Sequence, residues 1–116
     1  MIKEDYCSAE VAELLREKGA GDDIYFGYYT SKHNNDGTSD IVNTCTHQMA
    51  MKWLREMGWH ILCLYDFRFV NINLAYIPIL MPIKGGGAVP LKEGGFSTYE
   101  EAIDAALKYA LNKYVN

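Results

Sequence analysis

The sequence lacks the features that mark a membrane, secreted or nucleic-acid-binding protein. No apolar run reaches the ~18 residues that a membrane-spanning helix requires, and residues 1–5 do not begin the apolar stretch of a signal peptide. Basic residues are too few for a phosphate-backbone binder, since 11 Lys and Arg stand against 15 Asp and Glu. The three cysteines are odd in number and widely spaced, which indicates reduced thiols and no disulfide framework. We therefore expect a cytoplasmic protein with no membrane and no nucleic-acid partner.

The hydrophobic content, by contrast, is ample for folding. Hydrophobic residues make up 49% of the 116 residues, and 13% of the chain is aromatic. A chain of this length buries enough surface for one core without metal or disulfide support. We predict a single domain over residues 1–116.

Three helices are predicted from capping residues and apolar periodicity. The first covers about residues 9–18, between an N-cap at Ser8 and a stop at Gly19. The second is capped by Thr44 or Thr46 and ends at Gly58. The third follows the capping box at 97–100, or the alternative one at 98–101, and runs for nearly five turns.

The strands are predicted from runs of aromatic and β-branched residues. Residues 24–30 form an aromatic strand, and the polar run 31–40 is either an exposed loop or, at Asp36-Gly37, a hairpin turn that returns residues 41–42 alongside it. Residues 59–65 form a strand that is apolar on both faces. Residues 69–81 are predicted to form a second long strand, and its end at Pro78 should lie at an edge or be leaving the sheet. The glycine-rich segment 82–95 is predicted to be a loop.

The order of these elements predicts the fold class. Helix, strand, loop, helix, strand, strand, loop and helix favour an α+β fold. We expect an antiparallel sheet of three to four strands, with three helices packed mainly on one face.

Three blocks of the sequence resemble one group of proteins. The blocks are Thr46–Glu56, Glu10–Gly19, and Phe96–Ala102 with Leu107–Leu111, together about a third of the chain. They are similar to small proteins of unknown function from phages and prophages of gut Bacteroidetes. The resemblance implies an intracellular single-domain protein and supplies no catalytic residues. That group often has a proline where Cys45 stands here, so any special role of Cys45 concerns this sequence alone.

The spacing of potential metal ligands is poor. Cys45 and His47 flank a helix start, and His60 and Cys63 are three apart in a predicted strand, so they point to opposite faces. We predict no metal ligand, no cofactor and no catalytic residue. The glycines at 85–87 do not lead into a helix, so a surface loop is favoured over a phosphate cradle.

The aromatic residues of the predicted strands are the strongest functional signal. Helices on one face of a sheet bury only half of them, and the rest should form an association surface rich in tyrosine. The alternative is that the loops 31–43 and 82–95 cover this surface. The predicted interface residues are Tyr25, Tyr28, Tyr29, Trp59, Tyr65, Phe67, Phe69 and Tyr76.

These observations favour an interaction module that forms a homodimer, and they leave two alternatives open. A small-molecule-binding protein or enzyme would use His47, Cys45 or His60 near the glycine-rich loop, and at least two of them should converge in a pocket. A nucleic-acid-binding protein would need a basic surface despite the net charge of −4.

Overall fold

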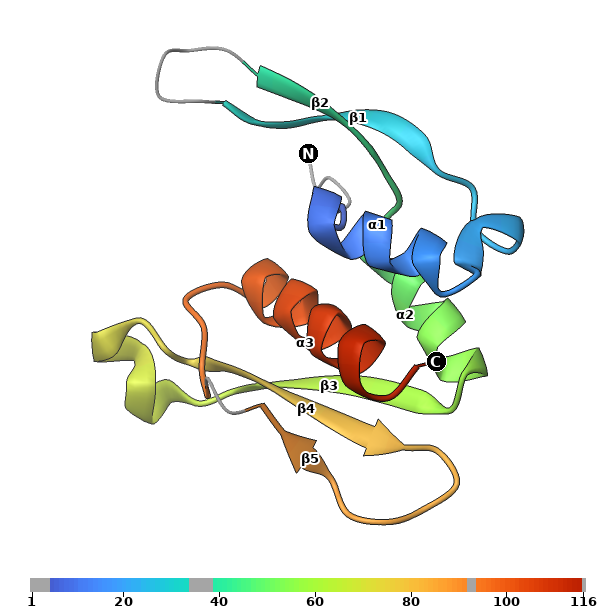
Figure 1. The fold of residues 1–116 in the computed structure, drawn as a ribbon. Helices are drawn as coiled ribbons and strands as arrows, with labels where there is room; N and C mark the ends of the chain where they lie inside the picture. The colour runs from blue at the N-terminus through green and yellow to red at the C-terminus, as the bar shows by residue number, and fades with distance from the viewer. Residues whose placement is uncertain (1–4, 34–38, 92–93, 116) are drawn as a thin grey trace.

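The computed structural model describes residues 5–33, 39–91 and 94–115, without the side chains of residues 30–33 and 39–40. The α+β class predicted from sequence is confirmed, and the strands are divided between two antiparallel sheets (Figure 1). The elements, in chain order, are α1 (Ala9–Glu17), η1 (Ala20–Asp22), β1 (Gly27–His33), β2 (Ser39–Thr44), α2 (His47–Glu56), β3 (Trp59–Tyr65), η2 (Phe67–Ile72), β4 (Tyr76–Pro82), β5 (Val89–Pro90) and α3 (Tyr99–Lys113).

The first sheet is the β1–β2 hairpin. Tyr29 pairs with Val42 in an antiparallel register, which confirms the hairpin alternative for this region. The Asp36-Gly37 pair predicted to turn it lies outside the described residues. Because β1 and β2 pair only with each other among the described strands, the expected single sheet is instead a hairpin and a separate three-stranded sheet.

The second sheet has the order β3-β4-β5. Pro78 lies in its central strand, opposite Cys63 of β3. On the other side, β5 pairs only with Ile79 and Leu80, so the missing amide of Pro78 interrupts no β5 pairing. Within the predicted loop 82–95, Val89–Pro90 thus adds a short edge strand to the sheet.

The helix ends follow the predicted caps. The hydroxyls of Ser8, Thr46 and Thr98 each accept a hydrogen bond from the amide three residues further on. Gly19 and Gly58 have φ values of 95° and 102°, the left-handed conformation that ends a helix at low cost when the residue is glycine. Of the predicted alternatives, Thr46 and Thr98 are the caps.

The segment 66–75 differs from the prediction. Residues 69–81 were expected to form one long strand, but the first part is the 3-10 helix η2, and β4 begins only at Tyr76. The carboxylate of Asp66 accepts a hydrogen bond from the Arg68 amide, and Asn73 takes a left-handed conformation with φ of 58°. These local interactions override the alternation of apolar residues, and they place Phe67 and Phe69 on a turn.

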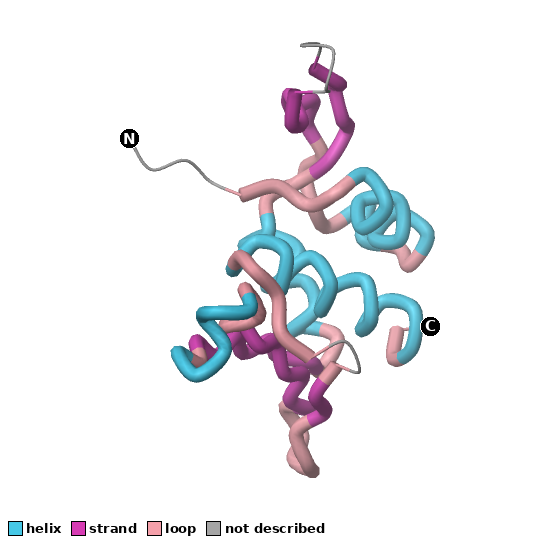
Figure 2. The backbone as a smooth tube through the Cα atoms, turned by 90° about the vertical axis from the view of Figure 1, so that its left-hand side faces the viewer, coloured by secondary structure: helices cyan, strands magenta, loops and turns pink. Residues whose placement is uncertain are grey.

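Helix α3 is the centre of the molecule. Figure 1 shows α3 between α1 and the three-stranded sheet, and Figure 2 shows the same layers from the side. It contacts β3, β4, α1 and α2, so it is apolar on most of its circumference. Its buried residues are Ala102, Ile103, Ala106, Leu107, Ala110 and Leu111.

Candidate functional site

The eight predicted interface aromatics do not share one face. Tyr28 of β1 and Phe67 of η2 are 77% and 78% exposed, but they belong to different ends of the layered structure. Tyr25 is also exposed, in the segment before β1. The aromatic residues are therefore spread over both sheets, because η2 is a turn and the β1–β2 hairpin is separate from β3 and β4.

Several of these rings already have partners within the chain. Tyr29 stacks on Tyr6 with ring centroids 3.9 Å apart. Trp59 stacks on Tyr114, just past the end of α3, at 4.4 Å.

Tyr65 and Tyr76 form an edge-to-face pair at 5.1 Å, and Tyr76 also meets Tyr99 of α3. Such contacts are the preferred geometry of aromatic pairs and stabilise the fold itself.

The uncovered face of the β3–β4 pair is aliphatic. Side chains of a strand alternate between faces, and Ile61, Pro78 and Leu80 point toward α3 and are buried. The alternate set points away from α3, and Leu64 at 44% exposure is its most open member. We call this set the outer face: His60, Leu62, Leu64, Ile77, Ile79 and Met81.

Apolar side chains continue beyond the outer face onto η2. This turn joins β3 to β4 at the end where Leu64 pairs with Ile77. Its apolar residues are all exposed, and they are Phe67, Phe69, Val70 and Ile72. The described part of the loop 82–95 leaves the outer face open, since Leu62, Leu64 and Met81 remain exposed.

A second candidate site brings together four polar side chains from three distant segments. Cys7 precedes α1, Cys45 and His47 flank the start of α2, and Asp104 lies in the second turn of α3. We call these four residues the Cys7–Asp104 cluster. Two backbone hydrogen bonds, each 2.9 Å long, hold the first two segments together. The Cys7 amide donates to the Cys45 carbonyl, and the His47 amide donates to the Asp5 carbonyl.

The side chains of the cluster are close and mostly buried. The Sγ atoms of Cys7 and Cys45 are 3.9 Å apart. His47 Nε2 lies 3.4 Å from Asp104 Oδ1, which also accepts a 2.9 Å hydrogen bond from the Ser8 amide. The Asp104 side chain is 27% exposed, so the cluster meets solvent on this side.

Electrostatics within the cluster follow from these contacts. The hydrogen bond between the two thiols, in which Cys7 keeps its proton, raises the pKa of Cys7 and lowers that of Cys45, and burial raises the pKa of Cys7 further. Burial alone would raise the pKa of Asp104, but hydrogen bonds from His47 and from the Ser8 amide outweigh it and lower that pKa. Asp104 is therefore ionised at neutral pH, and Cys7 is a neutral thiol.

The arrangement does not suit nucleophilic catalysis. Cys7, His47 and Asp104 are the residue types of a thiol nucleophile, base and orienting carboxylate. Cys7 is only 3% exposed, however, and its thiol is held neutral. A substrate carbonyl could not reach this sulfur without displacing its neighbours.

The metal set weighed from the sequence is dispersed, as its spacing suggested. His60 lies on the outer face, whereas Cys63 points toward α3. Cys45 and His47 join Cys7 and Asp104 instead. No pattern in the sequence pointed to Cys7 or Asp104, because 38 residues separate Cys7 from Cys45 and 57 separate His47 from Asp104.

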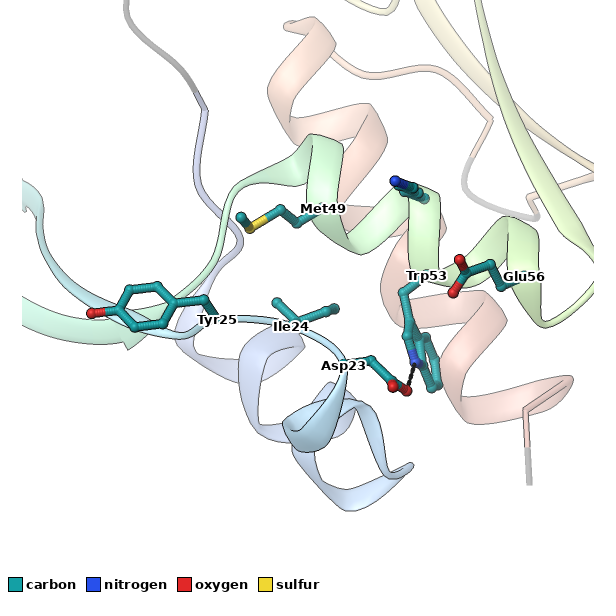
Figure 3. Close-up of a pocket in the computed structure, with 7 residues that line it drawn as sticks. Asp23, Ile24, Tyr25, Met49, Trp53 and Glu56 are labelled. Carbon is teal, nitrogen blue, oxygen red and sulfur yellow. Dashed lines mark hydrogen bonds between the residues drawn. The ribbon is translucent and has the colours of Figure 1, made fainter.

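A shallow groove lies between α2 and the segment before β1. Figure 3 shows Trp53 at one end of it, where its indole Nε1 donates a 3.1 Å hydrogen bond to Asp23. The groove has a volume of about 240 Å³, below the range of typical ligand pockets. None of Cys45, His47 and His60 lines it, so the convergence expected for the enzyme alternative is absent from this groove.

Comparison with known proteins adds no relationship. No protein-family model matches the chain, and no curated protein or solved structure is significantly similar to it. Among the described residues, no helix combines the length and apolar character needed to cross a membrane.

Proposed function

We propose that this protein is a small cytoplasmic interaction module that forms a homodimer through the outer face of β3 and β4. In keeping with the resemblance of its helical blocks, we propose that it serves as an accessory protein of a phage or prophage. The observation that carries the proposal is an aliphatic sheet face with no described element over it.

The composition of the outer face favours a second copy of the chain. Five of its six residues are apolar, and the sixth is His60, so the face carries no Asp, Glu, Lys or Arg. In a two-fold dimer the same patch meets itself, and charges near the axis would face identical charges. An uncharged, flat sheet face avoids that repulsion and can pack on its copy as two sheets pack in a sandwich.

The surface area of the chain supports association. A monomer of 13.2 kDa typically exposes about 6,400 Å², whereas this chain exposes 7641 Å². The excess of roughly 1,200 Å² is spread over the whole chain, including the separate β1–β2 hairpin, and the exposed residues of the outer face and η2 contribute to it. The radius of gyration, 14.7 Å, likewise exceeds the ~13.4 Å expected for 116 residues.

The apolar residues of η2 extend the proposed interface beyond the end of β3, and two of them are aromatic. Phe67 and Phe69 belong to the set predicted from the sequence, and they adjoin the outer face through β3. Tyr25 and Tyr28 lie on the β1 side, so this dimer would not bury them. The proposed dimer is thus the homodimer predicted from the sequence, but the centre of its interface is aliphatic and not aromatic.

Light scattering coupled to size-exclusion chromatography tests the proposal. We expect a mass of twice 13.2 kDa for the wild-type chain at micromolar concentration. The Leu62→Glu variant introduces a charge at the centre of the outer face, and it should weaken the dimer by at least about thirtyfold, the equivalent of ~2 kcal/mol.

Ile41→Glu is the matched control. Ile41 is also an exposed aliphatic residue on a strand, but it lies on β2, away from the outer face. This variant should remain dimeric. A wild-type chain that stays monomeric at all concentrations, or a dimer broken by Ile41→Glu and not by Leu62→Glu, would contradict the proposal.

A further inference from the structure

The Cys7–Asp104 cluster has the geometry of a metal site. One ligand atom from each of Cys7, His47 and Asp104 lies within 4.8 Å of the other two. The three residues come from the segment before α1, the start of α2 and the second turn of α3, so their convergence is a product of the tertiary fold. Random surface clusters of acidic groups do not combine a buried thiol, a buried imidazole and a carboxylate in this way.

His47 is poorly satisfied without a further partner. The residue is only 6% exposed, and its Nδ1 atom has no hydrogen-bond partner among the described residues. Its other ring nitrogen, Nε2, lies 3.4 Å from Asp104 Oδ1. Charge-assisted hydrogen bonds are usually 2.7–2.9 Å long, so this contact is long as well. Buried polar atoms are nearly always paired. An ion bound at Nε2 would still leave Nδ1 unpaired, so the observation that points to a bound ion is the long contact between Nε2 and Asp104 Oδ1.

The distances agree with tetrahedral coordination. Zinc holds imidazole nitrogen and carboxylate oxygen at about 2.0–2.2 Å, which places two such ligands about 3.4 Å apart in a tetrahedron. That is the separation observed between His47 Nε2 and Asp104 Oδ1. The Cys7 sulfur lies within 4.8 Å of the other two ligand atoms, against about 3.6 Å in a tetrahedral site with a zinc–sulfur bond of about 2.3 Å, so it would have to move by no more than about 1 Å.

The donor set selects the class of metal. Calcium and magnesium prefer oxygen ligands only, so a thiol and an imidazole argue against both. Mixed sulfur, nitrogen and oxygen donors in a redox-neutral, four-coordinate site are typical of zinc.

We propose that Cys7, His47 and Asp104 bind one zinc ion, with the fourth position open to water on the exposed side of Asp104. On binding, the Cys7 thiol releases its proton to solvent and coordinates as thiolate. The charges of the Cys7 thiolate and the Asp104 carboxylate then neutralise the divalent ion, which suits a site this deeply buried.

Cys45 has a supporting role in this arrangement. Its sulfur lies 3.9 Å from the Cys7 sulfur, and once Cys7 is a coordinated thiolate the Cys45 thiol would donate a hydrogen bond to it, as outer partners commonly do around zinc ligands. A second coordinated thiolate would leave the buried site with an excess negative charge. Zinc would thus link the segment before α1, helix α2 and helix α3 at one point.

Metal titration of the purified full chain tests the proposal. The protein is first treated with a chelator and kept reduced with a phosphine, so that no disulfide between Cys7 and Cys45 competes. We expect one equivalent of zinc to bind by calorimetry and to raise the thermal midpoint. Cobalt, as a spectroscopic substitute, should give the strong visible bands of a tetrahedral site and a sulfur-to-cobalt charge-transfer band. This wild-type measurement does not depend on any variant folding.

Variants identify the ligands. Cys7→Ser, His47→Gln and Asp104→Asn should each weaken zinc binding by at least about tenfold, and Cys7→Ser should abolish the sulfur-to-cobalt band. Cys45→Ser should retain that band. Cys63→Ser and His60→Gln are matched controls outside the cluster, and they should bind as the wild type does.

Three results would overturn the proposal. The first is failure of the reduced wild-type chain to bind one equivalent of zinc. The second is a cobalt complex with only the weak spectrum of octahedral coordination and no sulfur band. The third is loss of binding in Cys63→Ser or His60→Gln with retention in Cys7→Ser.

Discussion

The two faces of the β3–β4 pair are built from the same kinds of residue and have opposite environments. Toward α3 stand Ile61, Pro78 and Leu80, which are buried, and on the outer face stand Leu62 and Ile79, which are open to solvent or only half covered. Hydrophobicity alone therefore does not decide which face is covered. The position of α3 does, because one helix layer can cover only one face of a sheet.

The comparison explains why the sequence predicted an uncovered sheet face but not the residues that form it. The number of apolar residues on the strands indicates that one sheet face is not covered by helices. It does not indicate which residues form that face. The predicted interface consisted of bulky aromatic residues, whereas the uncovered face is made mainly of Leu, Ile and Met. Each of the following substitutions affects either the covered face, with the helix that covers it, or the outer face.

The largest effect is expected from truncating a residue on the covered face. Leu80→Ala should lower the free energy of unfolding by about 2–5 kcal/mol, because Leu80 is fully buried against α3 and leaves a cavity. Leu62→Ala, its counterpart on the outer face, should cost less than about 1 kcal/mol in the dilute monomer. Urea unfolding at low protein concentration measures both free energies of unfolding. Equal losses in the two variants would mean that the two faces are buried to the same extent.

The next effect concerns the concentration dependence of stability. A dimer gains about 1.4 kcal/mol of stability for each tenfold rise in concentration, which should raise its thermal midpoint by about 3–5 °C. Leu64→Glu should remove this dependence because it places a charge on the outer face. Scanning calorimetry over a hundredfold concentration range checks it, and a wild-type midpoint independent of concentration would count against an interface there.

A smaller effect is expected from weakening the helix that covers the inner face. The Thr98 hydroxyl accepts a hydrogen bond from the Glu101 amide at the start of α3, and Thr98→Ala should cost about 1 kcal/mol. Ser97→Ala is the control, since Ser97 contacts only the exposed Glu101 side chain. Chemical denaturation of both variants should rank them in that order, and the reverse order would place the cap at Ser97.

The smallest effect is a change in acid stability. The pKa of Asp104 is lowered in the folded chain, so its ionised form contributes stability above the ordinary value of 3.8 and loses it as pH falls through the folded pKa. His47 and the Ser8 amide face this carboxylate. With chelator present, wild type should exceed Asp104→Asn in stability at neutral pH, and the difference should shrink below about pH 4. A difference that grows with acidity would contradict the sign of the shift.

Local signals in the sequence were sufficient for much of the fold. Ser8, Thr46 and Thr98 cap helices, and Gly19 and Gly58 end them, because these roles depend on a few neighbouring residues. Residues 69–75 were wrongly predicted as part of a strand, again because of interactions between near neighbours. Capping by Asp66 and the left-handed Asn73 are also local, but they compete with an apolar alternation that is typical of a strand.

The candidate metal site, in contrast, could not be predicted from spacing. Cys7 and Asp104 become neighbours of His47 only when α1 and α3 pack together, and nothing in their local sequence encodes that contact. Cys45 and His47 were considered as ligands, but with His60 and Cys63, which the fold sends to opposite faces of β3. Ligand spacing is informative when ligands share one element or hairpin, and this site draws on three elements.

The position of α1 against α3 has a consequence for synthesis of the chain. The apolar side of α1, with Val11 and Leu15, is buried only when α3 is present, and α3 lies some ninety residues further along. Until α3 has been made, this short helix can pack only on η1 and β2, and an isolated helix of 9 residues is marginal in water. The packing of α1 is therefore completed only after α3 has left the ribosome.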